Sequence, residues 1–203
     1  MPVIYLTVGT AGAALDQLNF PYGIAYDPAK NGIYVADTDN SRVMYFTVGV
    51  RNGTIVAGNN TAGITSTQLN KPNGVYFDRI SNSIIIANTA GRNVVRWSIG
   101  ASNWTLVAGA FGGVAGTASN RFAYPSDVIL DPMNNLYVAD SSNHRIQFFF
   151  DGQTNGSTIA GFTGVNGSNA SSFDFPSVVA LDSQLSLYVC DLYNHRIQKF
   201  LRY

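Results

Sequence analysis

Three copies of an Asp-x-x-Asn-x-Arg pattern hold the most regularly spaced charged side chains in this chain. The copies are Asp37/Asn40/Arg42, Asp140/Asn143/Arg145 and Asp191/Asn194/Arg196. Each Asp and Arg flank a predicted hairpin turn, so the carboxylate can accept hydrogen bonds from the guanidinium across that turn. At the corresponding place in a fourth copy both charges are replaced together, by Asn88 and Asn93. We interpret the three Asp–Arg pairs as structural, because a lone partly buried charge is costly. The alternative is that they contact a ligand around one face of the molecule.

Two histidines, His144 and His195, lie at equivalent positions next to these pairs. Zinc is held by three or four protein ligands, and the matching positions in the other copies are Ser41 and Arg92. We therefore predict no metal site here. The histidines are better interpreted as residues of surface turns.

A candidate interaction surface is predicted from turn residues that lie outside the apolar runs. Trp104 lies in a predicted turn and has no aromatic counterpart at Gly53 or Gly156, which favours exposure and contact with a partner. The full set of candidates is Trp104, Asn143, His144, Asn194 and His195.

No constellation typical of an enzyme is present. The chain contains no Glu, and it has no HExxH, G-x-S-x-G or Gly-Lys-Ser/Thr phosphate-binding motif. Asp27, Asp78, Asp131 and Asp182 raise the alternative of calcium binding. Contexts such as Asp27-Pro28 are more typical of a turn that begins at the Asp. We expect no catalytic residue, no cofactor and no metal.

The elements that must position these residues follow from an internal repeat. Aligned on Pro21, Pro72, Pro125 and Pro176, the chain divides into four units of about 51 residues, each with short apolar runs rich in β-branched and aromatic residues. Four short strands with intervening turns are typical of a β-propeller blade. We predict an all-β propeller of four four-stranded blades.

The whole chain, 1–203, is predicted to be a single domain. The repeats span about 18–68, 69–121, 122–172 and 173–203, and residues 3–9 are predicted to supply the outer strand that the last repeat lacks. Joining both chain ends in one blade would cover an open sheet edge, which favours a closed four-bladed ring. The alternative is a portion of a larger, six-bladed ring.

The repeat resembles the NHL family. Its signature is seen in Pro125 to Asp131, in the Tyr-Val-Ala-Asp run ending at Asp140, and in Asn143-His144-Arg145-Ile146-Gln147; Asn194 to Gln198 repeats the last motif. The first two repeats depart from it, with Ser41 and Arg92 in place of His. The resemblance implies a non-enzymatic scaffold that binds a protein partner.

The family resemblance also leaves two alternatives. One is a metal-dependent lyase or hydrolase similar to the lyase domain of peptidylglycine amidating enzymes. The other is the target-recognition portion of a ubiquitin ligase or of an RNA-binding NHL protein. RNA is not favoured, because 12 Lys and Arg balance 12 Asp and the formal net charge is zero.

The composition does not identify a cellular compartment, but it bears on membrane association. Charged residues make up 12% of the chain, and no apolar run is long enough to span a bilayer, so we expect no membrane association. The oligomeric state cannot be predicted from the residues. The compartment stays open, with an extracellular hint from six Asn-x-Ser/Thr sequons, at Asn52, Asn59, Asn103, Asn155, Asn166 and Asn169.

Overall fold

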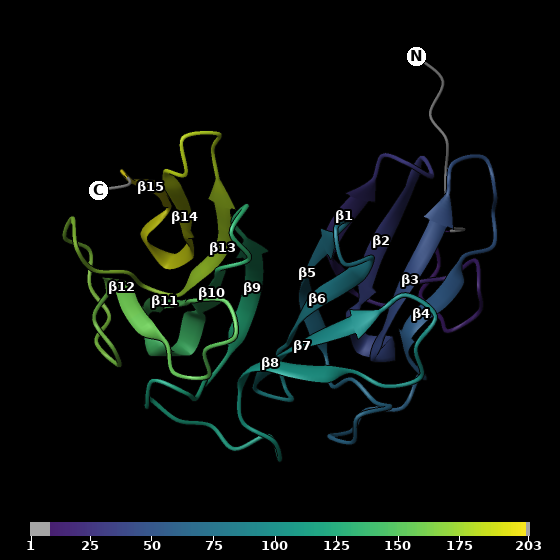
Figure 1. The fold of residues 1–203 in the computed structure, drawn as a ribbon, viewed down its shortest axis with the longest axis horizontal. Coiled ribbons are helices and arrows are strands. Elements are labelled where there is room, and N and C mark those ends of the chain that lie inside the picture. The colour runs from purple at the N-terminus through teal and green to yellow at the C-terminus, as the bar shows by residue number, and fades with distance from the viewer. Residues whose placement is uncertain (1–8, 202–203) are drawn as a thin grey trace.

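The computed structural model describes residues 9–201 as antiparallel sheets set side by side around an axis (Figure 1). The first sheet, blade 1, runs in the order β1-β2-β3-β4 and the second, blade 2, in the order β5-β6-β7-β8. Their strands are β1 (Pro21–Asp27), β2 (Gly32–Asp37), β3 (Arg42–Thr47), β4 (Thr54–Gly58), β5 (Pro72–Asp78), β6 (Ser83–Asn88), β7 (Asn93–Ser98) and β8 (Thr105–Gly109).

Blade 3 repeats the four-stranded order, and blade 4 has three strands among the described residues. These strands are β9 (Pro125–Leu130), β10 (Leu136–Asp140), β11 (Arg145–Phe149), β12 (Ser157–Gly161), β13 (Pro176–Leu181), β14 (Leu187–Asp191) and β15 (Arg196–Phe200). The predicted all-β propeller of four blades is confirmed. The outer strand expected at residues 3–9 falls almost wholly outside the described residues.

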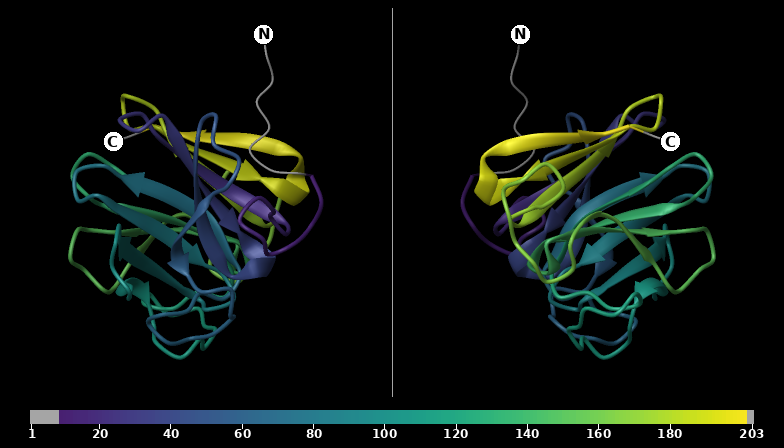
Figure 2. Two further views of the ribbon diagram at one scale, coloured as in Figure 1. Left: turned by 90° about the vertical axis from the view of Figure 1, so that its right-hand side faces the viewer. Right: turned by 90° about the vertical axis from the view of Figure 1, so that its left-hand side faces the viewer.

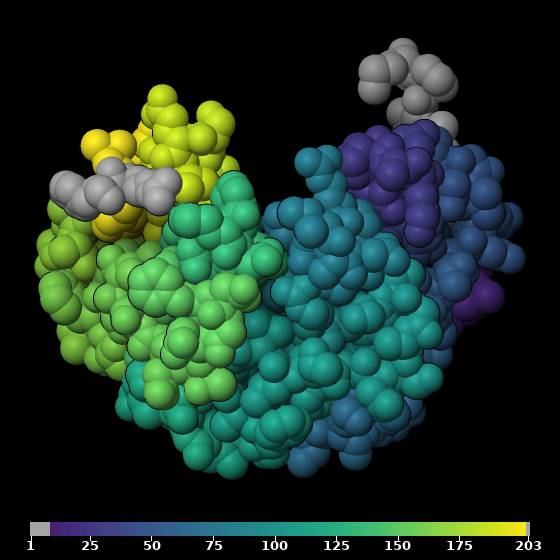
Figure 3. Space-filling view, viewed as in Figure 1, coloured from purple at the N-terminus to yellow at the C-terminus, as the bar shows by residue number. Residues whose placement is uncertain are grey.

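Each blade begins with an inner strand, and consecutive inner strands contact one another: β1 with β5, β5 with β9, and β9 with β13. No comparable junction joins β13 back to β1 within residues 9–201. The described part of the ring is therefore an open arc, with blades 1 and 4 on either side of a notch (Figure 3). The side views show both of these blades at the same end of the molecule (Figure 2). The closed ring that the sequence favoured is not formed by these residues.

Neighbouring blades pack face to face. Successive side chains of a strand point to opposite faces of its sheet, so each sheet presents apolar side chains on both faces. Between blades 1 and 2, Tyr34, Ala36 and Val43 pack against Ile84, Ile86 and Trp97. Between blades 2 and 3, Ile85, Ala87 and Val94 pack against Val128 and Val138. Because blade 2 is covered on both faces, every residue of β6 is buried.

Hydroxyl groups connect neighbouring blades close to the axis. Thr38 Oγ1 donates to the carbonyl of Pro72 at 2.7 Å, and Thr89 Oγ1 donates to that of Pro125 at the same distance. Ser141 Oγ repeats the bond to Pro176 at 2.6 Å. The fourth copy of this position is Leu192, which has no hydroxyl to donate.

The Asp–Arg pairs fasten the loop that enters each blade. Arg42 Nε donates to Asp37 Oδ2 at 2.6 Å, and both side chains are completely buried. Three of the remaining guanidinium N–H groups donate to the carbonyls of Ala13, Ala14 and Gln17. The pair thus ties residues 13–17 to the β2–β3 hairpin.

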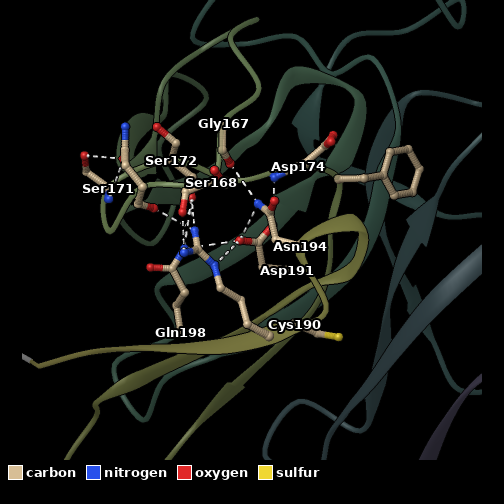
Figure 4. A network of polar contacts seen from close by, with 12 residues as sticks. Gly167, Ser168, Ser171, Ser172, Asp174, Cys190, Asp191, Asn194 and Gln198 are labelled. Carbon is tan, nitrogen blue, oxygen red and sulfur yellow. Dashed lines mark hydrogen bonds and ion pairs between the residues drawn. The ribbon is translucent and has the colours of Figure 1, made fainter.

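The same network recurs in blades 3 and 4. Arg145 Nε donates to Asp140 Oδ2 at 3.0 Å, and Arg196 Nε donates to Asp191 Oδ2 at 2.7 Å. In blade 4 the polar contacts converge from Gly167, Ser168, Ser172 and Asn194 (Figure 4). In blade 2 the charges are absent, and Asn88 Nδ2 donates to Asn93 Oδ1 at 2.9 Å.

Short 3-10 turns shape each hairpin that carries a pair. They are η1 (Thr38–Asn40), η2 (Ser141–Asn143) and η3 (Leu192–Asn194). The residue after each turn has a left-handed backbone: Ser41, His144 and His195 have φ of 51°, 54° and 54°. Asn and His are enriched in this conformation, which gives the histidines a local role in the turn.

We predict that Arg145→Asn destabilises the protein by about 3–5 kcal/mol, because Asp140 is left buried and charged without its partner. The double variant Asp140→Asn with Arg145→Asn imitates the blade 2 pair, and we expect it to unfold at a higher urea concentration than the single variant. Urea titration followed by circular dichroism measures both. Arg196→Asn is the matched control, because Arg196 is partly exposed and its loss should cost less. A double variant no more stable than Arg145→Asn would contradict the paired role.

Candidate functional site

The inner strands all begin next to the axis, and the residue before each proline faces that end of the molecule. These residues are Phe20, Lys71, Tyr124 and Phe175. Phe20, Lys71 and Phe175 have left-handed φ values of 53°, 49° and 59°. This conformation is uncommon for bulky side chains, and such strain is found most often at functional sites. The pre-proline position is therefore the first candidate for function.

Aromatic side chains gather at this end of the arc. Phe20 is 69% exposed and Tyr193, which comes from η3, is 60% exposed. The Phe175 ring lies 5.6 Å from the Tyr124 ring and 5.1 Å from the Tyr193 ring, measured between centroids. We call Phe20, Tyr22, Tyr124, Phe175 and Tyr193 the aromatic rim. It presents several amphipathic or apolar rings that lie on or beside the inner strands β1, β9 and β13 and in η3.

The rim includes a small hollow of about 130 Å³, which Phe20, Tyr22 and Tyr124 line. Asn73 Nδ2 donates to the Tyr124 hydroxyl at 3.4 Å in the same region. Lys71 Nζ lies 3.1 Å from Asp39 Oδ1 in an exposed ion pair. The hollow therefore has apolar walls, hydrogen-bonding groups and little net charge.

Asp127 lies on the inner strand of blade 3, where blades 1 and 2 have glycine. Its Oδ2 accepts a hydrogen bond from the Val179 amide at 3.0 Å, and its side chain occupies the space beside Gly74. A Cβ on Gly74 would lie 2.3 Å from Asp127 Oδ1, so this junction requires glycine there. Burial raises the pKa of Asp127 to about 6. Burial also raises the pKa of Tyr22, with a smaller contribution from the nearby Asp127 carboxylate.

The other end of the axis has a larger hollow of about 430 Å³, lined in part by Asp78, Asp131 and Asp182. All three carboxylates cap turns, as the sequence predicted. Asp131 Oδ1, for example, accepts from the amides of Met133 and Asn135, both at 2.9 Å. Backbone donation from Ser186 is the main reason why the pKa of Asp182 falls to about 2. These carboxylates are engaged with the backbone, which makes this end the weaker candidate.

The two histidines lie in different settings. His144 Nδ1 accepts a hydrogen bond from the Phe175 amide at 3.3 Å and so supports the rim. Asp174 Oδ1 lies 3.6 Å away, too far for a strong contact with it. His195 is exposed on blade 4. Within residues 9–201 no three His, Cys or Asp side chains gather closely enough to hold a metal ion.

Two of the predicted interaction residues are buried. Trp104 is 4% exposed: it packs between blades 1 and 2, and its Nε1 donates to the Gln68 carbonyl at 2.8 Å. Our expectation that Trp104 is exposed is wrong, because the loop between β4 and β5 packs against it and accepts hydrogen bonds from it at Ser66 and Gln68. Asn143 is also buried, and its Nδ2 donates to Asp140 Oδ2 and the Gly116 carbonyl. Asn194 makes the equivalent contacts in blade 4 and is partly exposed.

The sequence reasoning missed the aromatic rim. Its signal was present, since three of the four residues before the aligned prolines are aromatic. Tyr193 could not be found in this way, because its position in the first three repeats holds Asp39, Ala90 and Ser142. Only the fold places it beside Phe175.

Comparison with known proteins agrees with the repeat. The NHL repeat model matches residues 18–44, 122–149 and 173–200. A curated relative, the chloroplastic protein SUPPRESSOR OF QUENCHING 1 of Arabidopsis thaliana, is 29% identical over 89% of this chain and 20% of its own length.

Solved structures resemble the fold at low sequence identity. A gluconolactonase of Xanthomonas campestris matches with a TM-score of 0.69 and 18% identity, over 94% of this chain and 61% of its own. A chain in a nidogen/laminin complex matches with a TM-score of 0.62 and 16% identity, over 96% and 68%. An auxiliary nutrient binding protein of Bacteroides thetaiotaomicron matches with a TM-score of 0.69 and 17% identity, over 91% and 48%. The chain thus spans about a fifth of its curated relative and about half to two thirds of these structures.

We predict that the contribution of Asp127 to the stability of the protein is lost as the pH rises from about 4 to about 6. The folded pKa of Asp127 is raised above its unfolded value, so the folded state binds more protons in this window and loses stability as they leave. Asp127→Asn should remove about 1–2 kcal/mol of this dependence, while its amide oxygen can still accept from Val179. Urea unfolding at pH 4.5 and pH 7.5 measures the difference. An unchanged pH dependence in the variant would show that Asp127 is not its source.

Proposed function

Because the chain belongs to the NHL repeat β-propeller family, we propose that it is a non-enzymatic scaffold that binds a protein partner at the aromatic rim. The observation that carries this proposal is the exposure of Phe20 and Tyr193 at the end of the molecule where the rings of Tyr124, Phe175 and Tyr193 contact one another. Aromatic residues are enriched where proteins meet, and they supply much of the binding energy there.

The form of the rim suits a protein surface. Phe20, Tyr124 and Phe175 directly precede the inner strands β1, β9 and β13, Tyr22 lies on β1, and Tyr193 lies in η3, so each ring is anchored next to or within a regular element. The left-handed backbone at Phe20 and Phe175 holds the rings in place at an energetic cost. A preorganised aromatic patch loses little conformational entropy when it binds.

RNA binding is less well supported by the charges. Two of the repeat arginines, Arg42 and Arg145, are buried and bound to carboxylates and loop carbonyls. Arg196 is bound in the same way. These guanidinium groups are not available for phosphate, and the chain has no net positive charge to attract it.

An enzymatic role is the second candidate, since a gluconolactonase shares the fold. A similar fold at 18% sequence identity does not imply that the two proteins catalyse the same reaction. The strongest chemical feature of the axis is Asp127, whose Oδ2 already accepts the Val179 amide. We place this function second, because catalysis by one carboxylate would need further groups directed at a common substrate.

No helix among the described residues is long and apolar enough to cross a membrane.

We predict that peptides selected from a random displayed library on the native protein bind at the rim. Phe20→Ala and Tyr193→Ala should each weaken such a peptide at least about tenfold, the loss typical of an interface hot spot. Fluorescence anisotropy with the labelled peptide measures the change. Ile80→Ala is the matched control, because Ile80 is even more exposed than Phe20 but lies after the last residue of β5, away from the rim. Binding that survives both rim variants and is lost in the control would contradict the proposal.

We also predict that the purified protein holds less than one equivalent of zinc or calcium and does not hydrolyse gluconolactone. Elemental analysis and a pH-indicator assay for lactone opening measure these two properties. Stoichiometric metal together with lactone hydrolysis would favour the enzymatic alternative.

A further inference from the structure

Three of the six Asn-x-Ser/Thr sequons occupy one position of the repeat. They lie in the hairpins that lead into the outer strands, where the hydroxyl residue is the first residue of β4, β8 or β12. The sequons are Asn52-Gly53-Thr54, Asn103-Trp104-Thr105 and Asn155-Gly156-Ser157. The residue before the asparagine differs in each copy, whereas the asparagine and the hydroxyl are kept. The retained pair calls for an explanation, either in the fold or in a function.

The fold makes no common use of these three asparagines, all of which are exposed. Asn103 Oδ1 accepts a hydrogen bond from Ser66 Oγ at 3.3 Å, and Asn155 Oδ1 accepts one from Ser119 Oγ at 3.4 Å. Asn52 has no side-chain hydrogen bond within residues 9–201, and in the same part of the chain none of the three Nδ2 groups donates one. The Asp–Arg pairs differ in this respect, because their contact recurs in blades 1, 3 and 4.

The hydroxyl residues are exposed too, and their side chains make no hydrogen bond to any described residue. They are Thr54, Thr105 and Ser157. The residue between the asparagine and the hydroxyl points the other way. Trp104 is buried, and a Cβ on Gly53 or on Gly156 would lie 2.7 Å or 2.6 Å from the ring of Phe46 or Phe149. The hairpin backbone therefore directs the asparagine and the hydroxyl outward together.

Each of these hairpins is held by the loop that enters its blade. The amide of the residue after the asparagine donates to a carbonyl of that loop, at 2.8, 2.9 and 3.0 Å in blades 1, 2 and 3. The accepting carbonyls belong to Leu15, Ser66 and Ser119. In blade 1 an exposed ion pair between Arg51 and Asp16, at 3.1 Å, adds a further contact. The exposed asparagines are thus presented on turns whose backbone is fixed.

The hairpins lie at the end of the strands opposite to the aromatic rim. Strands β3 and β11 begin directly after η1 and η2 and end at the hairpin, and Tyr193 of the rim lies in the equivalent turn η3. A strand of five or six residues is about 17–20 Å long, which separates the two ends. Strands β4, β8 and β12 are also the last strands of their sheets, on the side away from the inner strands (Figure 1). A large group attached to these hairpins leaves the rim uncovered.

We propose that Asn52, Asn103 and Asn155 are N-glycosylated, and hence that the chain passes through the secretory pathway. In this reaction Nδ2 of the asparagine attacks the anomeric carbon of an oligosaccharide that is carried on a polyprenyl diphosphate. A C–N bond forms, and the bond from that carbon to the diphosphate oxygen breaks. The amide loses one proton, polyprenyl diphosphate leaves, and nothing is oxidised or reduced. Each site offers what the reaction needs, an exposed asparagine with an unbonded Nδ2 and an exposed hydroxyl two residues later.

The position also suits a bulky, hydrophilic group. Strands β4, β8 and β12 are edge strands, whose outer backbone groups can pair with another chain. A glycan attached two residues before the start of such a strand hinders that pairing. The other sequons, at Asn59, Asn166 and Asn169, lie in loops between blades at positions that are not equivalent, so they do not share this repeated setting.

The protein isolated from the cells that produce it tests the proposal directly. Peptide N-glycosidase in water enriched in heavy oxygen converts each glycosylated asparagine into a labelled aspartate, which peptide mass spectrometry locates. We expect the label at Asn52, Asn103 and Asn155. Unmodified asparagine at all three positions would overturn the proposal.

Variants identify the acceptor sites one by one. The chain is directed into the secretory pathway of cultured animal cells by an added, cleavable signal. Thr54→Ala, Thr105→Ala and Ser157→Ala should each remove one glycan, seen as one step of increased electrophoretic mobility. Thr54→Ser is the matched control, because it keeps the hydroxyl and should keep the glycan. If none of the three alanine variants loses a glycan, these hairpins are not acceptor sites.

A purely structural role for the asparagines predicts a different result. The triple variant Asn52→Gln, Asn103→Gln and Asn155→Gln is produced in bacteria without glycosylation and compared with the unmodified chain from the same source. We expect both to unfold at the same urea concentration, because the three side chains share no contact in the fold. A clearly lower midpoint for the variant would show that the asparagines are retained for the fold, and this would also overturn the proposal.

Discussion

Face-to-face packing of one sheet on the next is the interaction on which the rest of this molecule depends. A single four-stranded sheet exposes two apolar faces and is not stable alone. Stacking around an axis covers the faces in pairs, as Val43 and Ala36 of blade 1 are covered by Ile86 and Trp97 of blade 2. The first and last blades, blades 1 and 4, each keep one apolar face exposed, which is unfavourable. Ile24 and Ile197 show this directly, because their counterparts in covered blades are almost inaccessible to solvent.

The buried ion pairs have a second role. They fix the long loops between blades against the adjacent hairpins. A guanidinium has five N–H donors, and one carboxylate cannot use them all. In blades 1, 3 and 4 the arginine gives its remaining donors to carbonyls of the preceding loop. The pair is thus both a strand-to-strand contact and a loop clamp. Blade 2 keeps its hairpin with neutral Asn88 and Asn93, which shows that the hairpin can form without the charges.

The same geometry decides which residues remain for recognition. Arginines that looked suited to a ligand are used within the fold, and Asp carboxylates that looked suited to calcium cap turns. The aromatic residues that remain exposed at this end of the axis include Phe20, Tyr124 and Tyr193. Function in a propeller belongs to such residues rather than to the fold, which hosts binding proteins and enzymes alike.

The sequence by itself determined the repeat, the strands and the turns. Prolines at regular spacing, alternating apolar residues and Asp at turn starts are local signals, and each acts within a few residues of where it stands. The joint loss of both charges in repeat two also identified the Asp–Arg partners, because a hairpin brings them together without help from distant segments. Tertiary structure alone decided what is exposed. Trp104 was expected on the surface and is buried. The loop that covers it contains Gln68, which lies 36 residues earlier in the chain. Phe175 and Tyr193 meet only through the fold, and the open faces of blades 1 and 4 appear only when the blades are placed around their axis. Burial depends on segments that are distant in the chain. Two repeats with similar residues can therefore differ in exposure, because different segments pack against them.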